Sequence, residues 1–349
     1  MGIPQTMRAV RITQHGGPEV LDLAEVPVPV PQAGEVLIRV SAVALNNTDL
    51  WTREGAYGRP GDPTALSGWR GPIDFPRVQG ADVAGRVATV GTGVDAGLVG
   101  QRVVVDPTIY DSEGPDANPV GLMGSECDGG YAEYVVAPEN RVHDMTGSPL
   151  TDDQLAALPT AFGTALGMIE RGRLKENETV LVSGASGGVG IALVQIARAR
   201  GARVVAISSG SKIDTVREAG AHEVVDRAGD IAEQVRAAAP EGIDVALDVV
   251  AGELVSDGLP LLREGGRWVI AGALGGYGVS FDVRRLYLHN AQLIGSSMYT
   301  PTHFEMLMNM ARRSEIHPII AATFPLEQAA LAQEELARRG HVGKIVLHP

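Results

Sequence analysis

Apolar residues follow two different patterns along this chain, and the change falls near Thr151. Before it, short apolar runs with a period of two are bounded by glycine and proline, as Gly34–Val40 illustrates. A period of two is typical of half-buried β-strands. We expect strands over Met7–Thr13, Val20–Val26, Val36–Leu45, Gln79–Val90, Gln101–Asp106 and Tyr131–Ala137.

After a helix expected over Asp152–Arg171, buried strands alternate with amphipathic helices. Such alternation predicts a doubly wound parallel sheet with helices on both faces. The expected strands are Thr179–Ser183, Arg203–Ser208, Glu223–Asp226, Ile243–Val249, Arg267–Gly272 and Gln292–Ser297, and the helices are Ile191–Arg200, Lys212–Ala219, Ile231–Ala239 and Glu253–Arg263.

The last segments do not fit that six-stranded sheet. A helix over Thr302–Arg313 and strands over Ala322–Pro325 and Lys344–Leu347 are left over, so we assign them to the β-rich part. The predicted fold is therefore α/β in two domains. A β-rich domain comprises residues 1–155 and 298–349, and a dinucleotide-binding domain comprises residues 156–297.

A glycine-rich turn joins the first strand of the second domain to its helix. The stretch Thr179–Gly190 reads strand, turn and helix, with Ala185, Gly187 and Gly190 in the spacing of a dinucleotide fingerprint. A pyrophosphate can sit on the helix N-terminus only where side chains are absent. We expect Ser186, Gly187, Gly188 and Val189 to bind it.

The end of the second strand indicates the cofactor. An NAD site usually has a carboxylate there, but Ser208, Ser209 and Lys212 stand at this place, and Arg227 follows the next strand. Hydroxyls and cations suit a 2′-phosphate, so we expect NADPH. The alternative is that Lys212 and Arg227 are ordinary solvated charges.

Composition limits the classes of partner. The 349 residues are 44% hydrophobic with a formal net charge of −13, which argues against binding to nucleic acid backbones. Cys127 is the single cysteine, so an internal disulfide framework is excluded and a reducing compartment is favoured. No apolar run is long enough for a membrane span, and the start lacks a signal-peptide core. We expect a cytoplasmic protein that binds no membrane.

Several motifs together resemble the medium-chain dehydrogenase/reductase superfamily, and within it the zinc-independent quinone oxidoreductase (zeta-crystallin-like) branch. The resemblance implies a GroES-like catalytic domain, a Rossmann domain, a cofactor cleft between them, and a homodimer formed through the last Rossmann strand near Leu293–Tyr299. The motifs are Ala44–Trp51, Gln79–Gly85, Asp128–Tyr134, Leu158–Ala165, Ser183–Gly190 and His341–Leu347.

The resemblance also locates the positions that hold catalytic zinc in the family's alcohol dehydrogenases. The first cysteine position reads Asn46, the His-Glu pair reads Ala81-Asp82, and the later cysteine position reads Thr160. Zinc sites need several nitrogen or sulfur ligands, so we expect no metal.

Without zinc, a substrate must be activated by its own conjugation. Quinones, enones and enals qualify, because charge then develops on a remote oxygen that a hydrogen-bond donor can stabilise. The resemblance makes Asn46 and Tyr57 candidate catalytic donors and Trp51 an aromatic residue near the ring-binding site. Alternatively, Tyr57 is a half-buried aromatic residue, and Asn46 and Asp49 cap a helix.

Further cofactor contacts follow from the resemblance alone. They are Thr164, Val249, Val250, Gly272, Ala273, Leu274, Ser296, Ser297 and Lys344.

Two inserts depart from the family pattern. Gly58–Pro76 directly follows Tyr57, and we expect a lid over the substrate with Trp69 and Phe75 as apolar walls. Tyr110–Glu126 stands in the place of the structural-zinc lobe, where packing or a subunit contact is expected.

The preferred interpretation is an NADPH-dependent reductase of a quinone or an α,β-unsaturated carbonyl. The alternatives within the enzyme class are a carbonyl reductase and a tailoring enoyl reductase of a biosynthetic pathway. A non-catalytic NADPH-binding protein is the alternative from another class.

Overall fold

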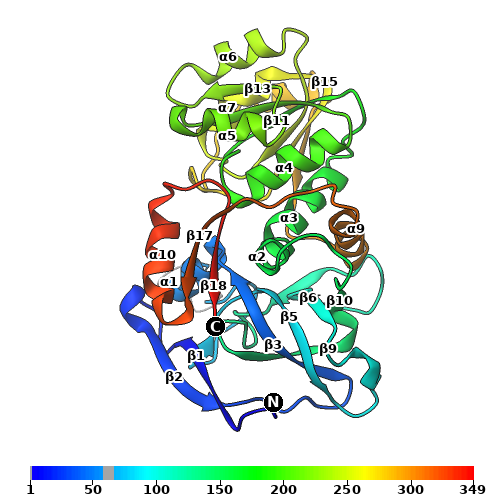
Figure 1. Cartoon of the computed structure of the whole chain (residues 1–349). Helices are drawn as coiled ribbons and strands as arrows, with labels where there is room; N and C mark the ends of the chain where they lie inside the picture. The colour runs from blue at the N-terminus through cyan, green and yellow to red at the C-terminus, as the bar shows by residue number, and fades with distance from the viewer. Residues whose placement is uncertain (1, 58–66) are drawn as a thin grey trace. The chain divides into compact units, whose positions relative to one another are not determined.

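The computed structural model describes residues 2–57 and 67–349 (Figure 1). The chain divides into two compact units. Unit 1 comprises Met1–Thr160 and Thr300–Pro349, and unit 2 comprises Ala161–Tyr299.

Unit 2 is built on a six-stranded sheet in which every neighbouring pair is parallel. The strand order β13-β12-β11-β14-β15-β16 is that of the doubly wound dinucleotide fold, so the predicted fold class is confirmed. The strands are β11 (Thr179–Val182), β12 (Arg203–Ser208), β13 (Glu223–Asp226), β14 (Ile243–Asp248), β15 (Leu262–Ile270) and β16 (Gln292–Gly295).

Helices pack on this sheet because their apolar stripes meet its buried strands (Figure 1). Leu181, Val205, Ala246 and Trp268 lie in one buried cluster. The helices are α3 (Pro159–Arg171), α4 (Gly188–Ala199), α5 (Ile213–Glu218), α6 (Ile231–Ala238), α7 (Glu253–Gly258) and α8 (Arg284–Tyr287).

Unit 1 is β-rich. Its main sheet has the order β10-β6-β5-β3-β18-β17, with β9 also paired to β3. The C-terminal strand β18 (Lys344–His348), red in Figure 1, runs antiparallel beside β3 (Glu35–Ala44). The remaining strands of this sheet are β5 (Asp82–Val90), β6 (Arg102–Val105), β9 (Tyr134–Pro138), β10 (Val142–Asp144) and β17 (Ile320–Pro325).

Smaller elements complete unit 1. A three-stranded sheet has the order β2-β1-β4, and β7 pairs with β8 as a hairpin. Their bounds are β1 (Thr6–Ile12), β2 (Leu21–Pro27), β4 (Arg77–Val78), β7 (Thr108–Tyr110) and β8 (Pro119–Leu122), and the helices are α1 (Asn47–Glu54), α2 (Asp152–Ala156), α9 (Pro301–Arg312) and α10 (Ala329–Arg338).

Two predicted helices were wrong in extent. The helix expected over Asp152–Arg171 is interrupted between α2 and α3, because Pro159 disfavours helical backbone at the residue before it. The helix expected over Glu253–Arg263 ends at Gly258, and a short 3-10 turn containing Pro260 leads into β15.

Candidate functional site

The glycine turn after β11 presents backbone to solvent in unit 2. Gly184 has φ +56°, and a Cβ on Gly190 would lie 2.2 Å from the carbonyl oxygen of Gly184. Gly187 is the exposed N-cap of α4, and a Cβ there would meet nothing nearer than 3.6 Å. The first N–H groups of α4 have no intrahelical acceptor, which suits a pyrophosphate. Ser186, Gly188 and Val189 are half-buried at this turn.

Two cations and a hydroxyl lie at the ends of β12 and β13. Ser208 Oγ is buried and has no hydrogen-bond partner among the described residues. Burial, and next the charge of Arg227, lower the pKa of the Lys212 ammonium. The backbone N–H of Arg227 donates to the carbonyl of Ser208 at 2.9 Å, and Ser209 is half-buried. An orphaned hydroxyl near two repelling cations fits an anionic group such as a 2′-phosphate.

Asp248, at the end of β14, organises the next predicted cofactor segment. Its carboxylate accepts from the backbone N–H groups of Val250 at 2.8 Å and Ala251 at 3.0 Å, and from Trp268 Nε1 at 2.9 Å. Ser183 Oγ donates to it at 2.5 Å and accepts from Val249 N–H at 3.0 Å. The sequence analysis missed Asp248 and Ser183. The available signal was an acidic residue, Asp248, near the end of a predicted strand and before a loop.

The segment Gly272–Leu274 lies beside Val249 and Val250. Leu274 N–H donates to the Val249 carbonyl at 3.4 Å, and a Cβ on Gly272 would lie 2.8 Å from the same oxygen. Gly272, Ala273 and Leu274 are half-buried. The structure thus brings these predicted residues together through their backbones.

Arg171, another residue that the sequence analysis missed, fixes the segment after β16. Its Nη1 donates to Ser296 Oγ at 3.0 Å and to the Met298 carbonyl at 2.8 Å. Thr164 Oγ1 makes a long contact of 3.6 Å with the Met298 sulfur. Ser297 lies between these positions and is half-buried.

A second cluster lies in unit 1, where strand register brings distant residues together. Ala44 at the end of β3 pairs with Asp82 of β5 and with Val346 of β18. Asn46 lies two residues after Ala44, and Lys344 lies two residues before Val346. They therefore face each other across the antiparallel pair of β3 and β18. The three polar side chains are at most 7% exposed.

Hydrogen bonds connect the side chains of this cluster. Lys344 Nζ donates to Asn46 Oδ1 and, at 3.3 Å, to Asp82 Oδ2. Asn46 Nδ2 donates to Asp82 Oδ2 at 2.9 Å and more weakly to the Ala44 carbonyl at 3.4 Å. Thr160, at the start of α3, donates to Asp82 Oδ1 through its N–H at 2.9 Å and its hydroxyl at 2.6 Å. The Asn46 amide is therefore already engaged on both sides.

Asp49 extends the cluster along α1. Its Oδ2 accepts from the backbone N–H of Asn46 at 2.7 Å and from the Tyr131 hydroxyl at 3.2 Å, so Asp49 holds the start of the helix as the capping alternative proposed. Burial is the main cause that raises the pKa of Asp49 to about 6, and the Asp82 charge adds to it. The nearby Lys344, which contacts Asp82, acts in the opposite direction and lowers the pKa of Asp49.

The donor set does not fit a resident zinc ion. The family resemblance puts Asn46, Ala81-Asp82 and Thr160 at the positions of the zinc ligands, but alanine offers no ligand atom and Lys344 Nζ already donates to both Asn46 and Asp82. Among residues 2–57 and 67–349, no group of three or more His, Cys, Asp or Glu side chains could hold a metal ion.

The aromatic candidates lie in separate contacts. Trp51 and Tyr57 meet edge to face, with ring centroids 5.7 Å apart. Phe75 packs on His15 at 4.9 Å, and Trp69 lies under Arg70, whose backbone N–H donates to Glu126. The expected lid over Gly58–Pro76 falls partly on residues 58–66, which lie outside the described residues. In the second insert, Tyr110–Glu126, the Tyr110 hydroxyl donates to Asp106 Oδ2 at 2.9 Å, which is a packing contact inside unit 1.

Thr48 is a further candidate that the sequence analysis missed. It lies in the first turn of α1, and its Oγ1 is buried without a hydrogen-bond partner among the described residues. An orphaned hydroxyl next to Asn46 suits a polar ligand.

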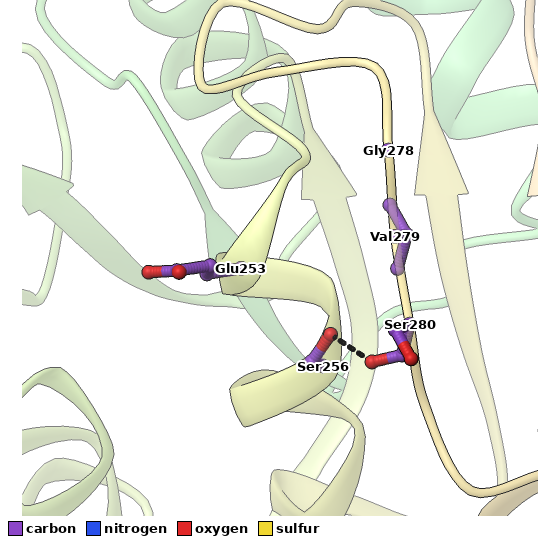
Figure 2. Close-up of a pocket in the computed structure, with 5 residues that line it drawn as sticks. All are labelled: Glu253, Ser256, Gly278, Val279 and Ser280. Carbon is purple, nitrogen blue, oxygen red and sulfur yellow. Dashed lines mark hydrogen bonds between the residues drawn. The ribbon is translucent and has the colours of Figure 1, made fainter.

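A separate cavity of about 510 Å³ lies in unit 2 (Figure 2). Its lining is Glu253, Ser256, Gly278, Val279 and Ser280, and the Ser256 hydroxyl donates to the Ser280 carbonyl at 2.7 Å. None of the predicted site residues lines it.

Comparison with known proteins identifies the family. Residues 32–147 match the family described as "Alcohol dehydrogenase GroES-like domain", and residues 188–313 match "Zinc-binding dehydrogenase". The chain is 34% identical to the quinone oxidoreductase of Rattus norvegicus over 98% of this chain and 97% of that protein. The chain belongs to the medium-chain dehydrogenase/reductase superfamily and is an oxidoreductase with a GroES-like and a Rossmann-type domain.

Three solved structures are similar to this chain over nearly its whole length. One from Sinorhizobium meliloti 1021, provisionally named an alcohol dehydrogenase, is 44% identical, with TM-score 0.95 over 99% of this chain and 98% of that one. A cobalt- and zinc-bound alcohol dehydrogenase from Pyrobaculum aerophilum is 30% identical, with TM-score 0.85 over 99% and 100%. The 2-octenoyl-CoA carboxylase reductase CinF, in complex with NADP and 2-octenoyl-CoA, is 25% identical, with TM-score 0.86 over 99% and 88%.

Proposed function

We propose that this protein is an NADPH-dependent oxidoreductase that transfers hydride to a quinone or an α,β-unsaturated carbonyl without zinc. The observation that carries the proposal is the hydrogen-bonded set of Asn46, Asp82 and Lys344 at the family's zinc position. A site without a Lewis acid favours acceptors that conjugation has already activated.

The cofactor side of the proposal rests on unit 2. The pyrophosphate is assigned to the turn Ser186–Val189, and the 2′-phosphate to Ser208, Ser209, Lys212 and Arg227. The nicotinamide half is assigned to Thr164, Val249–Val250, Gly272–Leu274 and Ser296–Ser297. When bound, the nicotinamide supplies the hydride, while these residues hold and orient it through backbone groups and hydroxyls. The NADP complex of CinF supports the choice of NADPH.

The substrate side rests on unit 1. Trp51 and Tyr57 form one aromatic edge, and the Tyr57 hydroxyl is proposed as a hydrogen-bond donor to the acceptor oxygen. Because both ends of the Asn46 amide are already hydrogen-bonded, we propose that Asn46 supports this site and does not contact the substrate. Trp69 and Phe75 remain proposed as apolar contacts of the substrate.

Two other functions have specific support among the relatives. The similarity to alcohol dehydrogenases favours a carbonyl or alcohol dehydrogenase, and the similarity to CinF favours a tailoring enoyl reductase. A non-catalytic NADPH-binding protein is the remaining alternative.

The deciding experiment follows NADPH oxidation by the purified, EDTA-treated protein. The acceptors are 1,4-benzoquinone, an enal, a cyclic enone, an enoyl thioester and a saturated ketone, each repeated with NADH. We expect turnover with the conjugated acceptors and NADPH. Activity on the saturated ketone that EDTA abolishes would overturn the mechanism. Tight NADPH binding with no turnover on any acceptor would favour the non-catalytic alternative.

We also propose a homodimer formed through β16, the edge strand of the unit 2 sheet. An unpaired edge strand offers free backbone groups to a second copy. Leu293 on this strand is 37% exposed, and the preceding Tyr287 and Leu288 are 63% and 61% exposed. Apolar side chains gathered at a sheet edge are typical of an interface.

In the described part of the chain, no helix is long and apolar enough to cross a bilayer.

A further inference from the structure

Lys344 contacts Asn46 and Asp82, two residues at or beside the positions that the family resemblance relates to the catalytic zinc site. Both atoms that it contacts are acceptors, the amide oxygen of Asn46 and a carboxylate oxygen of Asp82. Lys344 must therefore donate in both contacts. The side chain is 5% exposed and Asp82 is fully buried, so solvent screens this ion pair little.

The contacts of Lys344 determine the orientation of the Asn46 amide. Because Oδ1 accepts from Lys344, Nδ2 must point to Asp82, where it donates at 2.9 Å. Asn46 is also the N-cap of α1, the helix that carries Trp51. A change at Lys344 is thus transmitted to the start of the helix that carries one edge of the proposed substrate site.

The same contacts oppose a divalent cation. A metal ion bound to Asn46 Oδ1 and Asp82 Oδ2 would occupy the space of the Lys344 ammonium and meet its charge at close range. Removal of the ammonium would leave Asp82 and Asp49 buried without a cation. The pocket would then offer the Asp82 carboxylate, the Asn46 amide oxygen and the Thr160 hydroxyl, which are oxygen ligands for a hard or borderline metal.

We infer that Lys344 is the resident cation of the pocket formed by Asn46, Asp82 and Thr160, where it takes the place of a metal ion and holds Asn46, the N-cap of the helix that carries Trp51, in the orientation that supports the proposed substrate site. The catalytic part of this inference rests on the proposed function. The inference differs from the cofactor contact that the family resemblance implies for Lys344, and it makes this residue a positioning residue.

The test compares Lys344→Met with Lys175→Met, which removes an exposed lysine in the same way. Three quantities are measured: Co²⁺ bound per chain by dialysis and visible absorption, the Kd of NADPH, and kcat with 1,4-benzoquinone. We expect Lys344→Met to bind Co²⁺ while the wild type and Lys175→Met do not. The kcat should fall about 100-fold, as for loss of one preorganised electrostatic contact. The Kd of NADPH should stay within about threefold, less than the loss of a charged hydrogen bond to phosphate would cause.

Two results would overturn the inference. One is Lys344→Met protein that binds no Co²⁺. The other is a Kd of NADPH that rises tenfold or more, on the order expected for a lost phosphate contact, while kcat at saturation is unchanged. If the wild type turns over none of the acceptors, the proposed function fails, and Co²⁺ binding still decides the part of the inference that concerns the resident cation.

A second variant covers the case in which Lys344→Met does not fold. Lys344→Met combined with Asp82→Asn removes both charges and leaves no unpaired ion from this pair in the interior. We expect it to fold, to bind no Co²⁺, and to keep the loss in kcat, because Asn46 still lacks its donor. Recovery of wild-type kcat in this double variant would refute the positioning role.

Discussion

At the scale of single residues, Asp49 shows how burial changes the charge that a side chain can hold. It lies fully inside unit 1 beside Asp82, and the nearest cation is shared with that second carboxylate. Burial is the largest cause of its raised pKa, and the hydrogen bond from Asn46 N–H only partly offsets it. Asp49 is therefore a residue whose ionisation opposes folding.

Asp49→Asn should gain stability relative to the wild type as the pH rises. The folded-state pKa of about 6 exceeds the ordinary value of 3.8, so between these values the folded protein binds more protons than the unfolded one. The contribution of protonated Asp49 to the unfolding free energy of the wild type is complete below pH 3.8. This free energy falls by about 3 kcal/mol as the pH rises through 6. Urea unfolding at pH 4, 5, 6 and 7 measures it. The exposed Asp257→Asn is the control, and parallel curves for wild type and Asp49→Asn would contradict the prediction.

Lys212 and Arg227 should discriminate between the two nicotinamide cofactors. Burial, and next the charge of Arg227, lower the pKa of Lys212, and a bound phosphate would offset the repulsion between the two cations. Lys212→Ser with Arg227→Ser should raise the KM for NADPH about 10- to 100-fold, since charged hydrogen bonds are lost, and leave the KM for NADH nearly unchanged. Steady-state kinetics with both cofactors measures this, with Lys175→Ser as the control. Equal losses with both cofactors would remove these two residues from the phosphate site.

At the scale of elements, two glycines of the turn before α4 have different tasks. Gly190 is needed for packing, because a Cβ there would lie 2.2 Å from Gly184 O and 2.6 Å from Ala185 Cα. Gly187 has φ −78°, which any residue adopts, and its surroundings are open. The absence of a side chain at Gly187 therefore matters for a ligand that approaches the turn, and not for packing inside unit 2.

The two alanine variants should separate these tasks. Gly190→Ala should lose about 1–3 kcal/mol of unfolding free energy through overpacking. Gly187→Ala should retain its thermal stability without cofactor but bind NADPH about tenfold more weakly, because a methyl group displaces the pyrophosphate from the backbone. Thermal unfolding and fluorescence titration with NADPH measure the two effects. Unchanged NADPH affinity in Gly187→Ala would move the pyrophosphate away from this turn.

At the scale of the whole molecule, the edge strand β16 governs assembly in our proposal. Burial of Leu293 and its neighbours against a second copy would remove exposed apolar surface and pair the free strand edge. Such an interface is isologous, so one substitution acts twice.

Leu293→Lys should therefore convert a dimer into a monomer. Two lysines would meet near the twofold axis, where like charges oppose pairing. Size-exclusion chromatography with light scattering measures the mass. Leu331→Lys is the matched control, because Leu331 is also exposed, at 53%, but lies on α10 of unit 1. A wild type that is already a monomer, or a dimeric Leu293→Lys, would refute the interface.

Local patterns were sufficient for most of unit 2. Five of the six strands lie within two residues of their predicted bounds, as β12 over Arg203–Ser208 shows, whereas β15 begins at Leu262, five residues before its predicted start. The glycine turn was also visible, because its requirement for small residues is local. In unit 1, α10 and the β7–β8 hairpin were missed. The hairpin is short, and α10 packs against the distant segments α1 and η1 (Pro18–Val20) as well as against its neighbour β18.

The sequence by itself thus determined most of the strands and helices of unit 2, and it indicated a nucleotide turn, because those properties depend on neighbours along the chain. Only the tertiary structure decided which polar side chains meet. Asn46 and Lys344 are 298 positions apart, and Asn46 and Asp82 are 36 apart. Their contacts exist because β18, β3 and β5 lie side by side in one register. Register is a property of the folded sheet, so the contacts of Lys344 with Asn46 and Asp82 became visible only there.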